Sequence, residues 1–219
     1  MIDDIQFNKL QKFQIGSWAV WPDKKVESLL QFFKDDINKL HGNVIFVGLN
    51  RSGNGEKKKP KTKRTDYDFS NFHSIWRVGD GRLEQYIKPE FADKLMNAYM
   101  TDLYEERDGN SKNLKNKNLA EKKKSVNFLF KQIKIFDIDK VTIICFGDMA
   151  YKHLLQGLLN IKENKSKLLR IKNVEIEFRN KRMKYNLTIH KVIHYSGKVK
   201  DDKFAKVFPE QIKKINSTI

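Results

Sequence analysis

The sequence is poor in cysteine, proline and glycine, and it has no long apolar run. Its single cysteine, Cys145, excludes an intramolecular disulfide and a zinc site built from several cysteines. With only 4 Pro and 11 Gly, the chain is not of low complexity, while 15 Phe and 3 Trp supply apolar area for a packed core. No stretch of about 18 apolar residues occurs, so we expect no membrane span. The acidic opening MIDDIQ lacks the features of an export signal, and a reducing cytoplasm fits the lone thiol.

Acidic residues are also few relative to basic ones. Lys and Arg number 44 against 27 Asp and Glu, which gives a formal net charge of +17. An excess of this size favours a polyanionic partner, because cations that bind phosphates release the counterions condensed there. Charge alone does not choose between DNA, RNA and an anionic membrane surface.

Several short apolar segments predict a parallel sheet. Continuous, β-branched runs typical of strands buried on both faces occur at residues 44–50 (VIFVGLN), 140–147 (KVTIICFG) and 191–197 (KVIHYSG). A further strand is expected in MNAYMTDL, ending near Asp102. The alternation in VEIEF and YNLTIH is compatible with an added antiparallel hairpin.

Helical spacing of apolar residues separates these strands. It predicts helices at residues 25–40, 126–138, 148–159 and 201–215, with Asp148 as the cap of the third. Together the elements predict one domain over residues 1–219, an α/β protein of three layers (α/β/α) around a mainly parallel four-stranded central sheet.

Two polar, basic segments, residues 51–71 and 108–125, are expected to be loop insertions. Loops of this length in a compact domain often have a function, and phosphate contact is the function that suits their charge. The candidate contacts in the first segment are Arg51, Ser52, Lys57, Lys58, Lys59, Lys61, Lys63 and Arg64.

Polar side chains follow the predicted strands. Ligands of open α/β sheets bind beyond the carboxyl ends of the strands. Those ends carry Asn50, Asp102, Asp148 and His194. We therefore expect one amide, two carboxylates and a histidine near one edge of the sheet.

These segments resemble the motifs of the uracil-DNA glycosylase superfamily. VIFVGLNRS looks like its water-activating motif, and HYSG looks like its second motif, a histidine followed by a small-residue loop that enters the minor groove. AYMTDL resembles the strand with the base-reading residue, and FGDMAYKHL resembles the third strand and its helix. The resemblance extends from Asn43 to Lys200, with the segments in the family's order.

The resemblance implies a monofunctional DNA glycosylase that hydrolyses the N-glycosidic bond of a flipped base in single- or double-stranded DNA, without metal or cofactor. The reaction passes through an oxocarbenium-like sugar and an increasingly anionic base. Asn50 would orient the attacking water, because an amide is no efficient general base, and His194 would stabilise the departing base.

Other residues would hold the base and the DNA. A flipped base needs an aromatic platform, for which Phe72 is the candidate and Phe69 and Tyr67 are alternatives. Tyr195 or Val199 would fill the gap that the base leaves. The remaining implied contacts are Gly48 and Leu49 with the base, and Tyr195, Ser196, Gly197, Lys198 and Lys200 with the DNA.

The base-reading position is either Asn97 or Asp102, and we prefer Asp102 because it falls at a strand end. Uracil-specific members of the superfamily have an asparagine there, which both accepts and donates. An ionised aspartate has only acceptors, so it repels O4 of uracil and accepts from an amino group, as on cytosine-like or adenine-like bases. Asp102 therefore argues against uracil as the substrate.

Two other functions compete with this one. A nucleic-acid-binding protein on the same fold, without turnover, would use the same basic loops. A metal-dependent nuclease has only the scattered acids Asp66, Asp68, Glu175 and Glu177 in its favour. The remaining histidines show no metal-ligand spacing and are expected to be structural or surface residues: His41, His73, His153 and His190.

Overall fold

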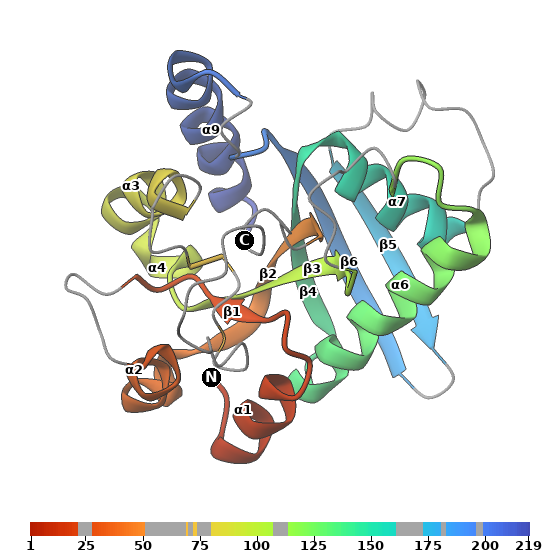
Figure 1. The fold of residues 1–219 in the computed structure, drawn as a ribbon, viewed down its shortest axis with the longest axis horizontal. Helices are drawn as coiled ribbons and strands as arrows, with labels where there is room; N and C mark the ends of the chain where they lie inside the picture. Colours follow the sequence, from red (N-terminus) through yellow and green to blue (C-terminus); the bar gives the residue numbers. More distant parts are fainter. Residues whose placement is uncertain are drawn as a thin grey trace, which may run out of the picture.

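The protein is an α/β fold around one six-stranded sheet, seen in a computed structural model (Figure 1). The structure describes residues 1–21, 28–50, 69, 72–73, 80–106, 114–160, 173–180, 183–195 and 199–219. The sheet has the order β1-β3-β2-β4-β6-β5. Its strands are β1 (Ser17–Trp18), β2 (His41–Asn50), β3 (Ala98–Tyr104), β4 (Lys140–Phe146), β5 (Asn173–Asn180) and β6 (Met183–Val192).

Four strands of the sheet, β3, β2, β4 and β6, run parallel, as predicted. The outer strands β1 and β5 each pair antiparallel with their neighbour. Strands β5 and β6 form the hairpin with which the sequence pattern was compatible.

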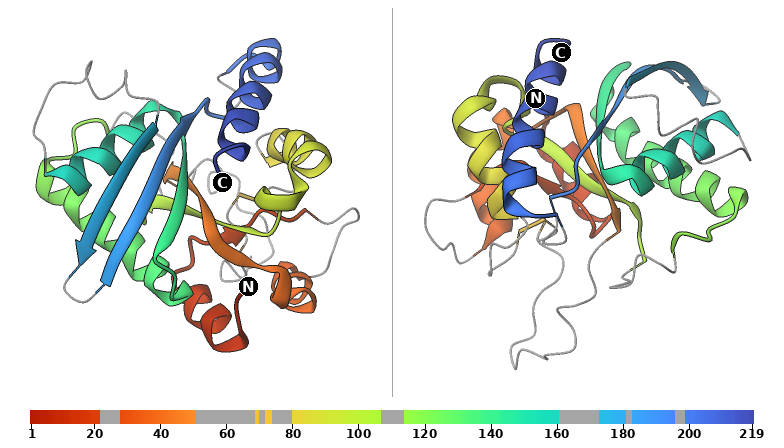
Figure 2. Two further views of the ribbon diagram at one scale, coloured as in Figure 1. Left: turned by 180° about the vertical axis from the view of Figure 1, so that it is seen from behind. Right: turned by 90° about the horizontal axis from the view of Figure 1, so that it is seen from above.

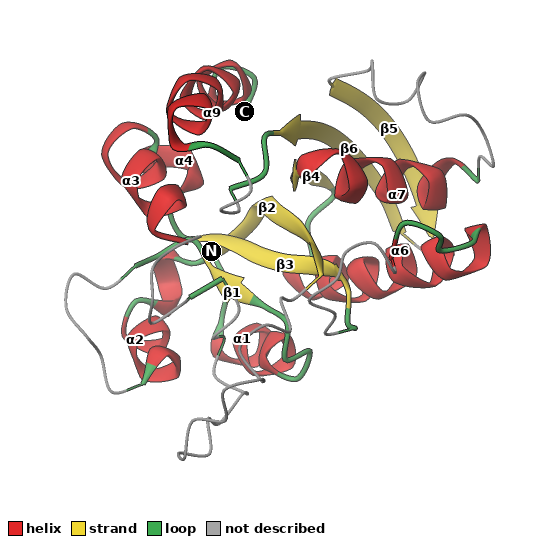
Figure 3. Ribbon diagram, turned by 45° about the horizontal axis from the view of Figure 1, so that its top comes forward, coloured by secondary structure: helices red, strands yellow, loops and turns green. Residues whose placement is uncertain are grey.

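Helices cover both faces of the sheet, so the three predicted layers are present (Figure 2). Helices α6 (Leu119–Ile133) and α7 (Gly147–Leu159) lie on one face, and α3 (Asp80–Glu90), α4 (Ala92–Leu95) and α9 (Asp201–Asn216) lie on the other. Helices α1 (Asp4–Gln11) and α2 (Leu29–Asp35) lie beside β1 (Figure 3). Two short 3-10 turns complete the described elements, at Ile37–Lys39 and Lys134–Phe136.

Alternation along β2 divides the interior into two cores. Val44 and Phe46 pack with α3 and α9, whereas Ile45 and Val47 pack with α6 and α7. The same alternation holds in β4, where Ile144 and Phe146 face α9. Because both faces are covered, the central strands are apolar at almost every position, which is why they read as continuous hydrophobic runs.

Helix α6 begins earlier than predicted. Asn118 caps it, since Asn118 Oδ1 accepts from the Glu121 backbone N–H at 3.0 Å and the Glu121 side chain accepts from the Asn118 N–H at 2.8 Å. The lysines at 122–124 lie in its first turns. The expectation of a loop over residues 108–125 is therefore wrong for 119–125, because the capping box outweighs the charge run.

Two further sequence expectations are wrong. Residues 185–190 and 191–192 belong to one strand, β6, since no turn residue separates His190 from Lys191. Asp148 does not cap α7, whose N-cap is Phe146. Asp148 lies in the first turn, where a carboxylate suits the helix dipole, and it pairs with Lys191 Nζ at 2.8 Å.

Buried polar bonds join α6 to β3. Gln132 Oε1 accepts from the Tyr99 hydroxyl at 2.9 Å and from Thr101 Oγ1 at 2.8 Å, and all three residues are buried. We expect Gln132→Leu to lower the free energy of unfolding by about 3 kcal/mol, because it removes the acceptor that two buried hydroxyls share. Chemical denaturation measures this loss.

Adding Tyr99→Phe and Thr101→Val to Gln132→Leu removes the orphaned hydroxyls and should restore much of the stability, because an all-apolar set needs no hydrogen bonds. If the triple variant is no more stable than Gln132→Leu, the loss comes from packing and not from the missing acceptor.

Candidate functional site

The sheet has a topological switch point between β2 and β4. The helix that follows β2 along the described chain, α3, covers one face, while α7, which follows β4 directly, covers the other (Figure 1). The crevice at the carboxyl ends of two such neighbouring strands is where open α/β sheets bind ligands. The candidate site belongs there.

At the end of β2, Gly48 leaves room for two other side chains. Gly48 is the register partner of Asp102 in β3. A Cβ at position 48 would collide with Asp102 Oδ1 and would lie 3.2 Å from Phe72 Cζ. The carboxylate and the aromatic ring therefore meet over the glycine, on the face that carries Val44 and Phe46.

Asn50 ends β2 two residues beyond Gly48, opposite Tyr104 in β3. It is half-buried, and its register partner Tyr104 packs on the side of α6 and α7, where the Tyr104 hydroxyl pairs with His153. Asp102 is 3% exposed and lies inside β3, two residues before the strand ends. The expected strand end at Asp102 is thus slightly too early, but the side chain does reach the carboxyl edge.

On the other side of the switch point, His194 lies against the turn from β4 into α7. Gly147 opens α7 with φ +82°, a left-handed geometry that suits glycine. A Cβ there would lie 3.2 Å from His194 Cδ2 and 3.3 Å from His194 Cβ. Gly147 therefore lets the histidine approach the backbone of the β4–α7 junction.

Aromatic rings connect the two sides. Tyr195 packs edge-on against Phe146 at 4.8 Å and stacks on His194 at 4.9 Å between ring centroids. Phe72 lies 6.5 Å from Phe146 and 6.2 Å from Tyr195. The cluster therefore extends from Gly48 to His194. Phe72 has a φ of 61°, a left-handed backbone conformation that is rare in bulky residues.

The structure separates the two candidates for the base-reading position. Asn97 precedes β3 at its amino end, where its carbonyl accepts from the His41 N–H at 3.0 Å and its own N–H donates to Ala19. It lies at the opposite edge of the sheet from Asn50, about 16 Å along the strand from Asp102. The assignment of Asn97 to the site is wrong.

Leu49 and Phe69 are also misplaced by the sequence interpretation. Leu49 alternates to the other face and packs in the core with α6 and α7. Phe69 is 4% exposed and packs against Phe7, Trp18 and Phe33. Neither side chain can bind a base at this edge, and Tyr67 lies outside the described residues.

Most of the predicted DNA contacts also lie outside the described residues: Arg51, Ser52, Lys57, Lys58, Lys59, Lys61, Lys63, Arg64, Ser196, Gly197 and Lys198. Lys200 is exposed directly before α9. Tyr195 and Val199 are half-buried against the core that contains Phe146.

The other histidines are structural, as expected. His73 Nε2 bonds to the Trp18 carbonyl at 3.1 Å, and burial lowers the pKa of His73 to about 4. Burial likewise lowers the pKa of His153, to about 4; its Nδ1 pairs with the Tyr104 hydroxyl at 2.9 Å. His41 bonds to the Met96 carbonyl at 3.0 Å, and His190 is 1% exposed.

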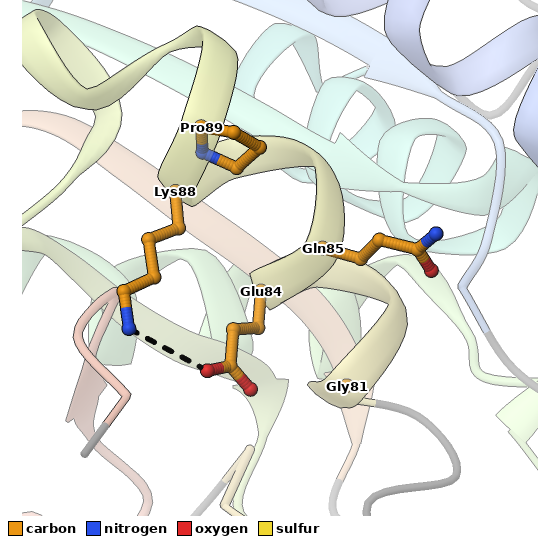
Figure 4. Close-up of a pocket in the computed structure, with 5 residues that line it drawn as sticks. All are labelled: Gly81, Glu84, Gln85, Lys88 and Pro89. Carbon is orange, nitrogen blue, oxygen red and sulfur yellow. Dashed lines mark ion pairs between the residues drawn. The ribbon is translucent and has the colours of Figure 1, made fainter. Parts of the chain in front are cut away.

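Two hollows lined by described residues lie away from this site. One, of about 350 Å³, lies along α3 beside the Lys88–Glu84 ion pair (Figure 4). The other, of about 220 Å³, lies between the end of β3 and the start of α6. Neither contains Asn50, Asp102 or His194.

The sequence patterns did not identify two residues that contact the backbone beside the site, Arg82 and Gln211. Both bind backbone atoms near His194 that are distant in the chain. No local sequence pattern predicts a contact between such distant residues. The apolar spacing of Leu83, Tyr86 and Ile87 does predict the helix α3 itself.

The chain matches no known family model and no curated protein. Over the described residues, no helix combines the length and the apolar character needed to cross a membrane. Within the same residues, no group of three or more His, Cys, Asp or Glu side chains is arranged to hold a metal ion.

The close approach of Asp102 and Phe72 to Gly48 can be tested with a single and a double variant. We expect Gly48→Ala to lower the free energy of unfolding by about 1 to 3 kcal/mol, because the new methyl group displaces Asp102 and Phe72. Gly48→Ala combined with Asp102→Ala should be less destabilised than the sum of the single variants. Strict additivity in denaturation experiments would contradict the contact.

The buried His73 predicts a pH dependence. Its pKa is about 4 in the folded protein against 6.5 when exposed, so the unfolded chain binds the proton more readily between these values. The free energy of unfolding therefore falls as the pH drops from 6.5 towards 4, by up to about 1.4 kcal/mol per pH unit for each such histidine.

His73→Gln keeps a donor for the Trp18 carbonyl but cannot titrate. Denaturation midpoints measured across this pH range should fall less steeply in the variant than in the wild type. Part of the slope remains, because burial also lowers the pKa of His153, of His41 and of His190. Equal slopes would contradict a buried neutral His73.

Proposed function

We propose that the protein is a monofunctional DNA glycosylase that hydrolyses the N-glycosidic bond of a flipped base and leaves an abasic site. One observation carries the proposal: Asn50, Asp102, Phe72 and His194 come from four separate segments to the carboxyl edge of the sheet. An amide, a carboxylate, an aromatic ring and an imidazole are the groups this reaction requires.

Asn50 orients the attacking water. The water oxygen bonds to C1′ of the sugar, the bond from C1′ to the base nitrogen breaks, and its electron pair leaves with the base. The water proton passes to solvent, because the amide of Asn50 can hydrogen-bond to water without taking a proton from it. Positioning of this kind accelerates the reaction, because it holds the water close to C1′ and in the right orientation.

His194 stabilises the base as negative charge develops on it. A ring N–H donated to the leaving base strengthens as that charge grows, which favours the transition state over the bound substrate. Stacking on Tyr195 and the contact with Gly147 fix the plane of the imidazole. The site thus has a water-orienting side at β2 and a charge-stabilising side beyond β6.

Phe72 and Asp102 bind the base. The ring of Phe72 offers a stacking surface next to the Asp102 carboxylate. An ionised carboxylate only accepts hydrogen bonds, so it selects a base edge that carries an amino group. We therefore expect the substrate to be a base with an exocyclic amino group and not uracil.

The charge of the chain suits a DNA partner. A net charge of +17 favours binding to phosphates, and exposed lysines such as Lys123, Lys124 and Lys200 lie in described parts of the chain. The cytoplasmic location expected from the single cysteine suits an enzyme that acts on chromosomal or foreign DNA.

Base release tests the proposal directly. Wild type, Asn50→Ala and the control Asn97→Gly are incubated with excess enzyme in EDTA, on DNAs that carry uracil, hypoxanthine, mismatched thymine or modified cytosines, and abasic sites are then cut with alkali. We expect wild type and Asn97→Gly to release a base, and Asn50→Ala to be slower by about 100-fold or more. Asn97→Gly suits the control because glycine accepts the left-handed φ of 66° at that position.

The alternative outcomes are distinct. A wild type that binds DNA in a salt-dependent way but releases no base is a nucleic-acid-binding module. Release that survives Asn50→Ala contradicts the role of Asn50. Strand cleavage that occurs in a parallel incubation with Mg²⁺ and is absent in EDTA indicates a metal-dependent nuclease.

A further inference from the structure

The backbone on both sides of His194 is held by side chains from two helices. The Ile193 N–H donates to Gln211 Oε1 at 2.7 Å, and Gln211 belongs to α9. The Tyr195 carbonyl accepts from Arg82 Nη1 at 3.3 Å, and Arg82 belongs to α3. His194 therefore lies between two backbone anchors that are independent of each other in the chain.

Arg82 makes more than one bond to this connection. The same nitrogen, Nη1, donates to the Val199 carbonyl at 2.9 Å, and Nη2 pairs with the Asp201 carboxylate in the first turn of α9. The guanidinium also lies over the Phe204 ring, 5.6 Å from its centroid. One planar cation thus contacts four residues of the chain from Tyr195 to Phe204.

Arg82 and its ion-pair partner Asp201 differ in burial. The Arg82 side chain is 16% exposed, whereas that of Asp201 is 88% exposed. An ion pair with so exposed a carboxylate contributes little, because water screens it. The bonds to the two carbonyls are therefore the important ones. Both come from Nη1, which the planar guanidinium over Phe204 holds in place, whereas a lysine ammonium is a compact charge on a flexible stem.

The anchors are themselves on rigid elements. Helices α3 and α9 lie side by side over the sheet (Figures 1 and 2), and Tyr86 packs edge-on against Phe204 and Phe208 at 5.8 and 6.2 Å. Leu83 and Ile87 of α3 are fully buried in the same core as Ile212 of α9. Loops are usually the mobile parts of a fold, whereas the backbone at Ile193, Tyr195 and Val199 is bonded to two packed helices.

From these contacts we infer that Arg82 and Gln211 are positioning residues that fix the imidazole of His194 at the candidate site. The inference rests on the proposed glycosylase function. Gln211 sets the backbone before His194, Arg82 sets the backbone after it, and Gly147 and Tyr195 set the ring. A displacement of about 1 Å in such a group can lower a rate 100-fold.

Four variants separate this role from general stability. Arg82→Lys keeps the charge but loses the planar guanidinium that places Nη1, and Gln211→Met keeps the size but loses the acceptor. Their matched controls are Asp201→Asn, which removes only the exposed ion pair, and Gln211→Glu, which keeps an acceptor oxygen. Each is compared with wild type by thermal unfolding, by DNA affinity, and by single-turnover base release at saturating enzyme.

We expect Arg82→Lys and Gln211→Met to slow the single-turnover step by about 10- to 100-fold, while Asp201→Asn and Gln211→Glu stay within about threefold of wild type. DNA affinity and unfolding temperature should change little among the folded variants. A fall in affinity with an unchanged rate, or equal rates in all four variants, overturns the inference.

Amide hydrogen exchange gives a readout that needs no activity. The amides from Ile193 to Tyr195, and that of Val199, should exchange faster in Arg82→Lys and Gln211→Met than in the two controls. Unchanged exchange overturns the anchoring even if the enzyme is active. Faster exchange with a wild type inert on every substrate supports the anchoring and rejects the glycosylase proposal, so the two failures are distinguishable.

Discussion

Burial of β2 on both faces is the constraint on which the rest of the structure depends. Because side chains alternate along a strand, each residue of β2 is assigned to one of two cores by its position alone. Val44 and Phe46 define the side of α3 and α9, and Gly48, beside Asp102, continues it beyond the last large apolar side chain. The candidate site is thus the polar continuation of a hydrophobic face.

The site combines buried polar groups with aromatic surroundings. Asp102 is almost fully buried and lies beside Phe72, while His194 stacks on Tyr195. Charges and dipoles in such surroundings act more strongly than in water, and they do so only when their geometry is fixed in advance. The two glycines provide that geometry by leaving space, and Arg82 and Gln211 provide it by holding the backbone.

Much of the fold could be predicted from the sequence, because doubly buried strands have a recognisable composition. The strands around VIFVGLN and KVTIICFG and the helix after the second follow from apolar spacing. Asn50, Asp102 and His194 followed from their place near strand ends. The start of α6 was misread because a lysine run obscured a capping box that the sequence does contain.

Other features depend on pairing between distant segments and had no local signal. The register of β3 against β2 decides that Asp102, and not Asn97, reaches the carboxyl edge. The face on which Leu49 lies depends on which neighbours cover β2. The contacts of Arg82 are made with backbone carbonyls more than 100 residues away, and carbonyls are the same in every residue.

The pairing of β6 with β4 has a consequence for how the chain tolerates insertions. From Asn186 to Val192 the two strands stay in register without a bulge, and Val192 pairs with Phe146. His194 lies two residues beyond Val192, so this ladder sets the point at which the chain leaves the sheet towards the histidine. One residue inserted in this stretch would reverse the face of every later position of β6. Two inserted residues would preserve the face, so tolerance to length changes here should follow the parity of the insertion.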